Sequence, residues 1–299
     1  MNIQHLQYLV TLYHTGNMVE AANECFVTQP TISKAVKNLE TEFGIRILET
    51  SYVNRVVFTS EGEDFVRHAQ VILNYSRNMK ERFKKSHELS LRVASQHYSF
   101  VIESMSILLD RYKKENYEMT LMESDTKTIM EFVYEGKAEL GILYRSQRNQ
   151  KAIDKALKER SLIFEEMGSC GFRAFMAPKH PLAKKKKVSL EDLAAYPFVC
   201  YLQRNYYVDF FEEGYIPDSS QILRVTDRDS MYAIMESNLA CTIGTGVVRE
   251  ELDESKLSSR PIEGLDDQIQ LGTIRREDHE SGRLVQEFVD IVKENFENK

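Results

Sequence analysis

The sequence lacks the features that define membrane, secreted and zinc-binding proteins. Only four cysteines occur in 299 residues and none forms a CxxC pair; they are Cys25, Cys170, Cys200 and Cys241. This spacing argues against a disulfide framework or a zinc finger and fits a reducing cytoplasm. No apolar run reaches the roughly 18 residues that a membrane-spanning helix needs. The first residues, MNIQHLQYLV, lack the charged head and cleavage site of a secretory signal. We therefore expect a cytoplasmic protein without a membrane partner.

Catalytic and metal-binding patterns are missing as well. Seven histidines are scattered without paired metal-ligand spacing. Neither a Ser–His–Asp motif nor the glycines of a phosphate loop occur, so we expect no metal, no cofactor and no enzyme activity. The lysine run at residues 184–187 is interpreted as a solvated loop rather than a targeting signal.

Charge is distributed unevenly along the chain, whose net charge is −7 at pH 7. The first 90 residues contain ten basic and ten acidic side chains, so the other 209 carry the whole net charge. A neutral N-terminal segment leaves room for a local nucleic-acid-binding surface without demonstrating one. The length corresponds to about two domains at typical domain sizes.

Three short helices are predicted at the start of the chain. The first ends at Gly16, and Asn17 is expected to cap the second. Thr28 is expected to cap the third, with Pro30 in its first turn, where a missing N–H costs nothing. Helical spacing predicts one buried stripe on the third helix, made of Ile32, Val36, Leu39 and Phe43.

The opposite face of the third helix is polar, with Thr31, Ser33, Lys34, Lys37 and Asn38. Short hydroxyls and amides can bind base edges or phosphates, and lysines neutralise phosphates. A solvated face is the ordinary alternative. Two short helices joined by a tight turn favour a helix-turn-helix, and β-like pieces at 45–49 and 55–58 predict a wing.

A long helix is predicted from residue 60 to 87. Alternating four- and three-residue steps form a heptad seam, whose members are Phe65, Ala69, Ile72, Ser76, Met79 and Phe83. Packing of this helix on its own domain is the alternative, but its length favours pairing with a second copy.

The remaining two hundred residues alternate strands and helices, which predicts a parallel α/β sheet. A second such region begins near residue 171, and crossing strands near 162–167 and 268–274 would join two subdomains. Ligands of open α/β sheets bind at the carboxyl ends of strands, beside helix N-termini.

Candidate effector-binding residues follow the expected strands at those ends. They are Ser95, Gln96, Ser124, Asp125, Thr126, Tyr144, Arg145, Thr226, Asp227, Gly244 and Thr245. Hydroxyls, helix ends and Arg145 suit a small carboxylate. Helix capping is the alternative for each Ser or Thr, and a surface ion pair is the alternative for Arg145. Asp125 and Asp227 could instead select an amine.

The segments EAANECFVTQPTISKAVKNLETEFGIRIL and FTSEGEDF, within residues 3–66, resemble the N-terminal signature of LysR-type transcriptional regulators. The resemblance implies an α+β protein in three parts. These are a winged helix-turn-helix at 1–59, a linker and dimerisation helix at 60–88, and an effector-binding domain of the periplasmic-binding-protein type at 89–299. Within the last part, subdomain I is expected at 89–163 and 270–299, and subdomain II at 164–269. The stretch APKHPLAKKKKVSLEDLAAYPFV resembles part of subdomain II.

Motif positions carry DNA contacts over to Gln29, Pro30, Thr31, Ser33 and Lys34. The family usually continues with Phe-Glu-Arg where this chain has Leu48, Glu49 and Thr50. An arginine expected near the wing is therefore absent, and Arg55 or Arg46 would substitute. The full set of expected DNA-binding residues is Thr28, Gln29, Pro30, Thr31, Ser33, Lys34, Lys37, Asn38 and Arg55.

These observations predict a DNA-binding transcriptional regulator controlled by a small-molecule effector, with a small carboxylate or other anion as the favoured class. Its expected partners are double-stranded operator DNA, the effector and further copies of the chain as a homodimer or homotetramer, with RNA polymerase as a further candidate. Two alternatives stay open. One is a redox-sensing regulator on the same scaffold, and the other is a solute-binding or enzymatic α/β protein that does not bind DNA.

Overall fold

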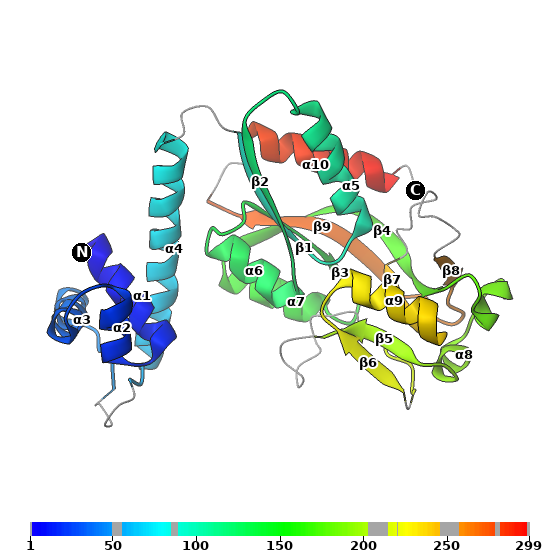
Figure 1. The fold of residues 1–299 in the computed structure, drawn as a ribbon, viewed down its shortest axis with the longest axis horizontal. Coiled ribbons are helices and arrows are strands. Elements are labelled where there is room, and N and C mark those ends of the chain that lie inside the picture. Colours follow the sequence, from blue (N-terminus) through cyan, green and yellow to red (C-terminus); the bar gives the residue numbers. More distant parts are fainter. Residues whose placement is uncertain are drawn as a thin grey trace. The chain divides into compact units, whose positions relative to one another are not determined.

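The computed structural model describes residues 2–49, 56–84, 89–202, 215–219, 221–245, 257–278 and 282–297 (Figure 1). The chain divides into two compact units. One contains residues 1–87 with 135–137, and the other contains residues 88–134 and 138–299.

The first unit is helical. Its helices are α1 (Ile3–Thr15), α2 (Met18–Glu24), α3 (Gln29–Phe43) and α4 (Ser60–Lys84). A small core forms where α1 and α3 face each other, and Leu6, Leu9 and Ile32 are fully buried in it. An antiparallel bridge between Leu48 and Phe58 begins the predicted wing.

Local capping agrees with the predicted boundaries, although the cap of α3 lacks a side-chain hydrogen bond. The Asn17 side chain accepts hydrogen bonds from the N–H groups of Val19 and Glu20, as a cap of α2 should. Thr28 precedes α3 but makes no side-chain capping bond, because its hydroxyl lies 2.9 Å from that of Thr31. Thr28 is nonetheless the N-cap residue of α3, as predicted, and its carbonyl oxygen accepts the Thr31 N–H at 2.9 Å.

The second unit is built on a mixed sheet. Its strands are β1 (Leu89–Ser95), β2 (Tyr117–Glu123), β3 (Leu140–Arg145), β4 (Leu162–Met176), β5 (Phe198–Tyr201), β6 (Ile222–Val225), β7 (Cys241–Thr245), β8 (Ser258–Pro261) and β9 (Gln268–Arg276). Their order is β2-β1-β3-β9-β4-β7-β5-β6, and β8 pairs with β4.

Helices cover this sheet on both sides. They are α5 (Ser99–Arg111), α6 (Thr126–Tyr134), α7 (Gln150–Glu159), α8 (Leu190–Ala194), α9 (Arg228–Asn238) and α10 (Arg283–Glu297), with a 3₁₀ turn at Pro181–Lys184. Alternate residues of β1 point to opposite faces, so Val93 joins the core under α5 and α10 whereas Ala94 joins the core under α6 and α7. Figure 1 shows α5 and α10 together on one side and α6 and α7 on the other.

The crossing strands correct the prediction of a parallel sheet. The strands β1, β2 and β3 are parallel, and so are β5, β6 and β7. However, β9 runs antiparallel to β3 and β4, and β4 runs antiparallel to β7, because both strands pass between the subdomains. The pieces expected near 162–167 and from 171 are one strand, β4, with a register shift between Glu166 and Gly168.

Candidate functional site

The outer face of α3 is open to solvent. The predicted DNA-binding residues of α3 and its N-cap residue Thr28 are all exposed; they are Thr28, Gln29, Pro30, Thr31, Ser33, Lys34, Lys37 and Asn38. On the opposite face Ile32, Val36 and Leu39 are buried, as the spacing predicts. Phe43 was expected to complete this buried stripe, but it is 45% exposed and contacts Phe65 edge-to-face at 4.9 Å.

The segment after α3 is fixed by its own helix. Glu40 Oε1 accepts hydrogen bonds from the N–H groups of Ile47 at 2.8 Å and Leu48 at 3.1 Å. Gly62 in α4 lies so close that a Cβ there would be 2.1 Å from the Ile47 carbonyl oxygen, so only glycine fits. Arg55, expected to contact DNA, lies outside the described residues, as does Thr50.

The predicted seam on α4 divides into two parts. Phe65 and Ala69 pack in the core of their own unit, which was the alternative explanation for the pattern. Further along, Ile72 is 37% exposed and Met79 is 60% exposed. Ser76 is half-buried, and the Phe83 side chain lies outside the described part of the helix.

Several predicted effector residues meet at the end of β1. Ser95, Gln96 and Thr126 are buried there. The Gln96 side-chain amide donates to the Thr126 hydroxyl at 2.9 Å, and the Ser124 N–H donates to the Ser95 carbonyl oxygen at 3.0 Å. These bonds tie the end of β1 to the start of α6.

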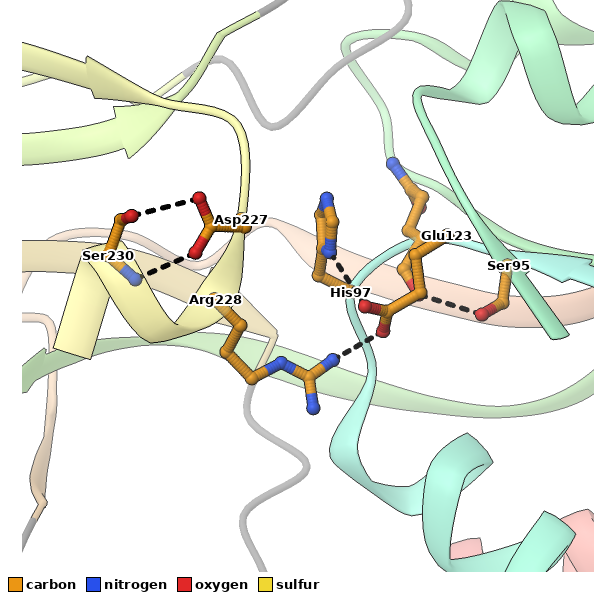
Figure 2. Close-up of polar contacts among 7 residues, drawn as sticks. Ser95, His97, Glu123, Asp227, Arg228 and Ser230 are labelled. Carbon is orange, nitrogen blue, oxygen red and sulfur yellow. Dashed lines mark hydrogen bonds and ion pairs between the residues drawn. The ribbon is translucent and has the colours of Figure 1, made fainter.

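The two predicted aspartates act as helix caps. Asp125 accepts hydrogen bonds from the N–H and hydroxyl of Thr128 at 2.9 and 2.8 Å. Asp227 caps α9 through two such bonds from Ser230, both of 2.8 Å, shown in Figure 2. The bonds from Ser230 lower the pKa of the Asp227 carboxyl. Both carboxylates are therefore engaged by their own helices.

Arg145 and Tyr144 at the end of β3 have structural roles. The Arg145 guanidinium lies 3.0 Å from Asp154 of α7 and 3.9 Å from the ring centroid of Phe164. The contact with Asp154 is an ion pair, which was the alternative to effector binding by Arg145. Tyr144 is buried in the core. Elsewhere Thr226 is exposed, and Gly244 and Thr245 are half-buried on β7 beside β4.

Four residues that the sequence reasoning missed link the two subdomains. Glu123 ends β2, and its carboxylate lies 2.6 Å from the Arg228 guanidinium and 3.2 Å from His97 Nδ1 (Figure 2). The His97 ring stacks on Tyr201 with centroids 3.9 Å apart. Each of the four lies at or near a strand end, so the same strand-end pattern that predicted Ser95 and Thr126 could have indicated them.

The electrostatics of this cluster follow from burial. Burial is the largest cause that raises the pKa of the Tyr201 hydroxyl, and it also raises the pKa of Tyr232. The side chains of Arg228, His97 and Glu123 are only 16%, 17% and 27% exposed. The partly buried Glu123–Arg228 ion pair is therefore weakly screened by salt.

The four cysteines all lie in the described part of the chain, and no disulfide joins them. Cys241 is buried, and burial raises its pKa to about 12. Cys25, Cys170 and Cys200 are half-buried. Over the described ranges, no helix is long and apolar enough to cross a membrane, and no group of three or more His, Cys, Asp or Glu side chains could hold a metal ion.

A helix-turn-helix unit joined to a two-subdomain α/β unit defines a class of two-domain regulators, and comparison with family models identifies the family. Residues 3–63 match the bacterial regulatory helix-turn-helix protein model of the lysR family, and residues 86–297 match the LysR substrate binding domain. The chain belongs to the LysR family.

Curated relatives are distant. The hydrogen peroxide-inducible genes activator of Pectobacterium carotovorum subsp. carotovorum is 27% identical over 65% of this chain, which spans only 62% of that relative's length. The malolactic fermentation system transcriptional activator of Lactococcus lactis subsp. lactis is 25% identical over 81% of both chains.

Solved structures share the fold. CbnR, a LysR family transcriptional regulator, superposes with a TM-score of 0.58 at 18% identity over 99% of both chains. A full-length OxyR variant from Pseudomonas aeruginosa gives 0.56 at 19% identity over 98% of both chains.

Proposed function

We propose that this protein is a cytoplasmic, sequence-specific DNA-binding transcriptional regulator whose second unit binds a small anionic effector without transforming it. The observation that carries the proposal is the exposed polar face of α3, opposite a buried stripe, in a helix-turn-helix. Membership of the LysR family supports the same function.

In the proposed complex α3 enters the major groove. Gln29 can bind adenine through its amide, Thr31 and Ser33 can bind base edges, and Lys34 and Lys37 can neutralise phosphates. The exposed Ile72 and Met79 on α4 are proposed to contact a second copy. A dimer of this kind would set two α3 helices about 34 Å apart, or a multiple of that spacing, along the DNA.

The test begins with selection of DNA sites by the purified full-length protein, followed by binding measurements at several salt concentrations. Lys37→Ala should weaken binding to all sites and reduce the salt slope by about one, whereas Thr31→Ala with Ser33→Ala should reduce discrimination between sites. Lys155→Ala removes an exposed lysine of α7 and serves as the control. Failure to select any sequence at moderate salt would refute DNA recognition.

The effector is proposed to bind between the two subdomains, beside Gln96, Thr126 and Arg228. Arg228 is the cation we assign to an anionic effector, because its ion pair with Glu123 lies at the junction of the subdomains. Arg145 instead pairs with Asp154 of α7 and lies over the Phe164 ring. An effector shifts the protein only if it binds two conformations unequally. A thermal-shift screen of small carboxylates should therefore give hits that Arg228→Gln abolishes.

Redox sensing is the second candidate, and it is favoured by the relatives described as hydrogen peroxide-inducible genes activators. Cys170 and Cys200 are half-buried, whereas Cys241 is buried with a raised pKa. Simultaneous replacement of these three by Ser separates the candidates. A redox sensor would lose oxidant-dependent DNA binding, and a metabolite sensor would keep its response to effector.

A further inference from the structure

Two contacts join the subdomains beside the Glu123 carboxylate, and they are the Glu123–Arg228 ion pair and the stacking of His97 on Tyr201. Glu123 Oε1 at the end of β2 lies 2.6 Å from Arg228 Nη2 in the first turn of α9, on the other subdomain. Glu123 Oε2 lies 3.2 Å from His97 Nδ1, and the His97 ring stacks on Tyr201 across the same junction with an interplanar angle of 17°. Figure 2 shows Glu123 between His97 and Arg228.

The position of Arg228 explains why it needs an anion. It occupies the first turn of α9, where the positive end of the helix dipole disfavours a cation. Its side chain is only 16% exposed, so water compensates little of its charge. Removal of one member of a partly buried ion pair such as this one leaves a charge that water compensates incompletely. At this junction, Glu123 supplies the compensating carboxylate.

We propose that the Glu123 carboxylate acts as a clamp, because its ion pair with Arg228 holds the two subdomains together. The effector carries a carboxylate or phosphate group that displaces Glu123 and binds Arg228 in its place. The inference deepens the proposed effector site and rests on it. Displacement breaks the Glu123–Arg228 bond between the subdomains while His97 stays on Tyr201. The anionic group of the effector thereby replaces the Glu123 carboxylate as the partner of Arg228, which changes the contact between the subdomains.

A clamp of this kind reduces the apparent affinity of the effector. A ligand that binds only the form with Arg228 released has an affinity lowered by the fraction of that form. If about one molecule in ten has Arg228 free, removal of the Glu123 charge should tighten anion binding about tenfold. The same change should loosen the contact between subdomains.

The experiment uses the full-length protein with acetate, succinate and inorganic phosphate as probes. Calorimetry measures their binding, and hydrogen exchange of segments 123–130 and 226–232 measures the clamp. The variants are Glu123→Gln, Arg228→Gln and the charge-swapped pair Glu123→Arg with Arg228→Glu. Glu165→Gln is the matched control, because Glu165 pairs with Arg275 at 2.8 Å on the neighbouring strand.

Glu123→Gln is expected to speed hydrogen exchange in both segments and to increase the affinity for at least one probe about tenfold. Arg228→Gln is expected to abolish the binding of that probe. The charge-swapped pair should restore slow exchange. Exchange in Glu123→Gln that matches Glu165→Gln overturns the clamp. Unchanged or weaker binding of all three probes by Glu123→Gln overturns the displacement. None of these readouts involves DNA, so failure of DNA recognition is distinguished from failure of this inference.

Discussion

The link between α3 and the segment that follows it gives the sharpest stability prediction. Glu40→Ala removes the oxygen that accepts the N–H groups of Ile47 and Leu48 at 2.8 and 3.1 Å. Hydrogen bonds to charged groups each contribute about 1.5–3 kcal/mol. Since the two share one partly exposed oxygen, we expect their joint loss to cost about 2–3 kcal/mol. Glu40→Gln keeps a neutral oxygen and should cost about half as much.

Amide hydrogen exchange of the full-length protein measures this loss of stability. A cost of about 2 kcal/mol corresponds to roughly thirtyfold faster exchange of the Ile47 and Leu48 amides if the segment opens locally. If the whole unit unfolds instead, the midpoint temperature of its thermal unfolding should fall by roughly 10–20 °C. Glu24→Ala removes an exposed carboxylate from the last turn of α2 and should leave both values unchanged. Exchange at residues 47 and 48 that is equal in Glu40→Ala and wild type would refute the reasoning.

Four further predictions follow from single positions. Phe26 is 95% exposed at φ +55°, so Phe26→Asn should raise stability to denaturant by about 0.5–1 kcal/mol, since asparagine tolerates this conformation. Burial lowers the pKa of His180. Below pH about 6.5 the unfolded chain therefore takes up a proton that the folded chain does not, so stability should fall as pH falls, and His180→Gln should flatten this slope in denaturant titrations. Met79→Asp should shift the protein towards monomer in sedimentation, because a charge at an exposed apolar seam position opposes pairing. Cys241 should stay unmodified by iodoacetamide at pH 8 in the folded chain, since its pKa is raised to about 12.

Local signals predicted most of the helices and strands, and long-range pairing accounts for what was missed. The cap at Asn17 and the stripe at Ile32 depend on neighbours within a few residues, so spacing alone finds them. The antiparallel course of β9 depends on pairing with β3 and β4, which no local pattern encodes. Glu123 and Arg228 are 105 positions apart, and only the fold brings them together.

Asp125 and Asp227, which cap α6 and α9, limit the groups at the junction between the subdomains that can bind the charged group of an effector. Free N–H groups at the starts of α6 and α9 were expected to favour an anion, but Asp125 and Asp227 already bind N–H groups there. We therefore assign anion selectivity at the junction to Arg228, whereas amine selectivity would come from Glu123. Glu123→Gln separates the two, because loss of its charge frees Arg228 for an anion but removes the carboxylate that an amine would use. Tighter binding of a carboxylate by this variant, with no gain for the matching amine, would identify the effector as an anion.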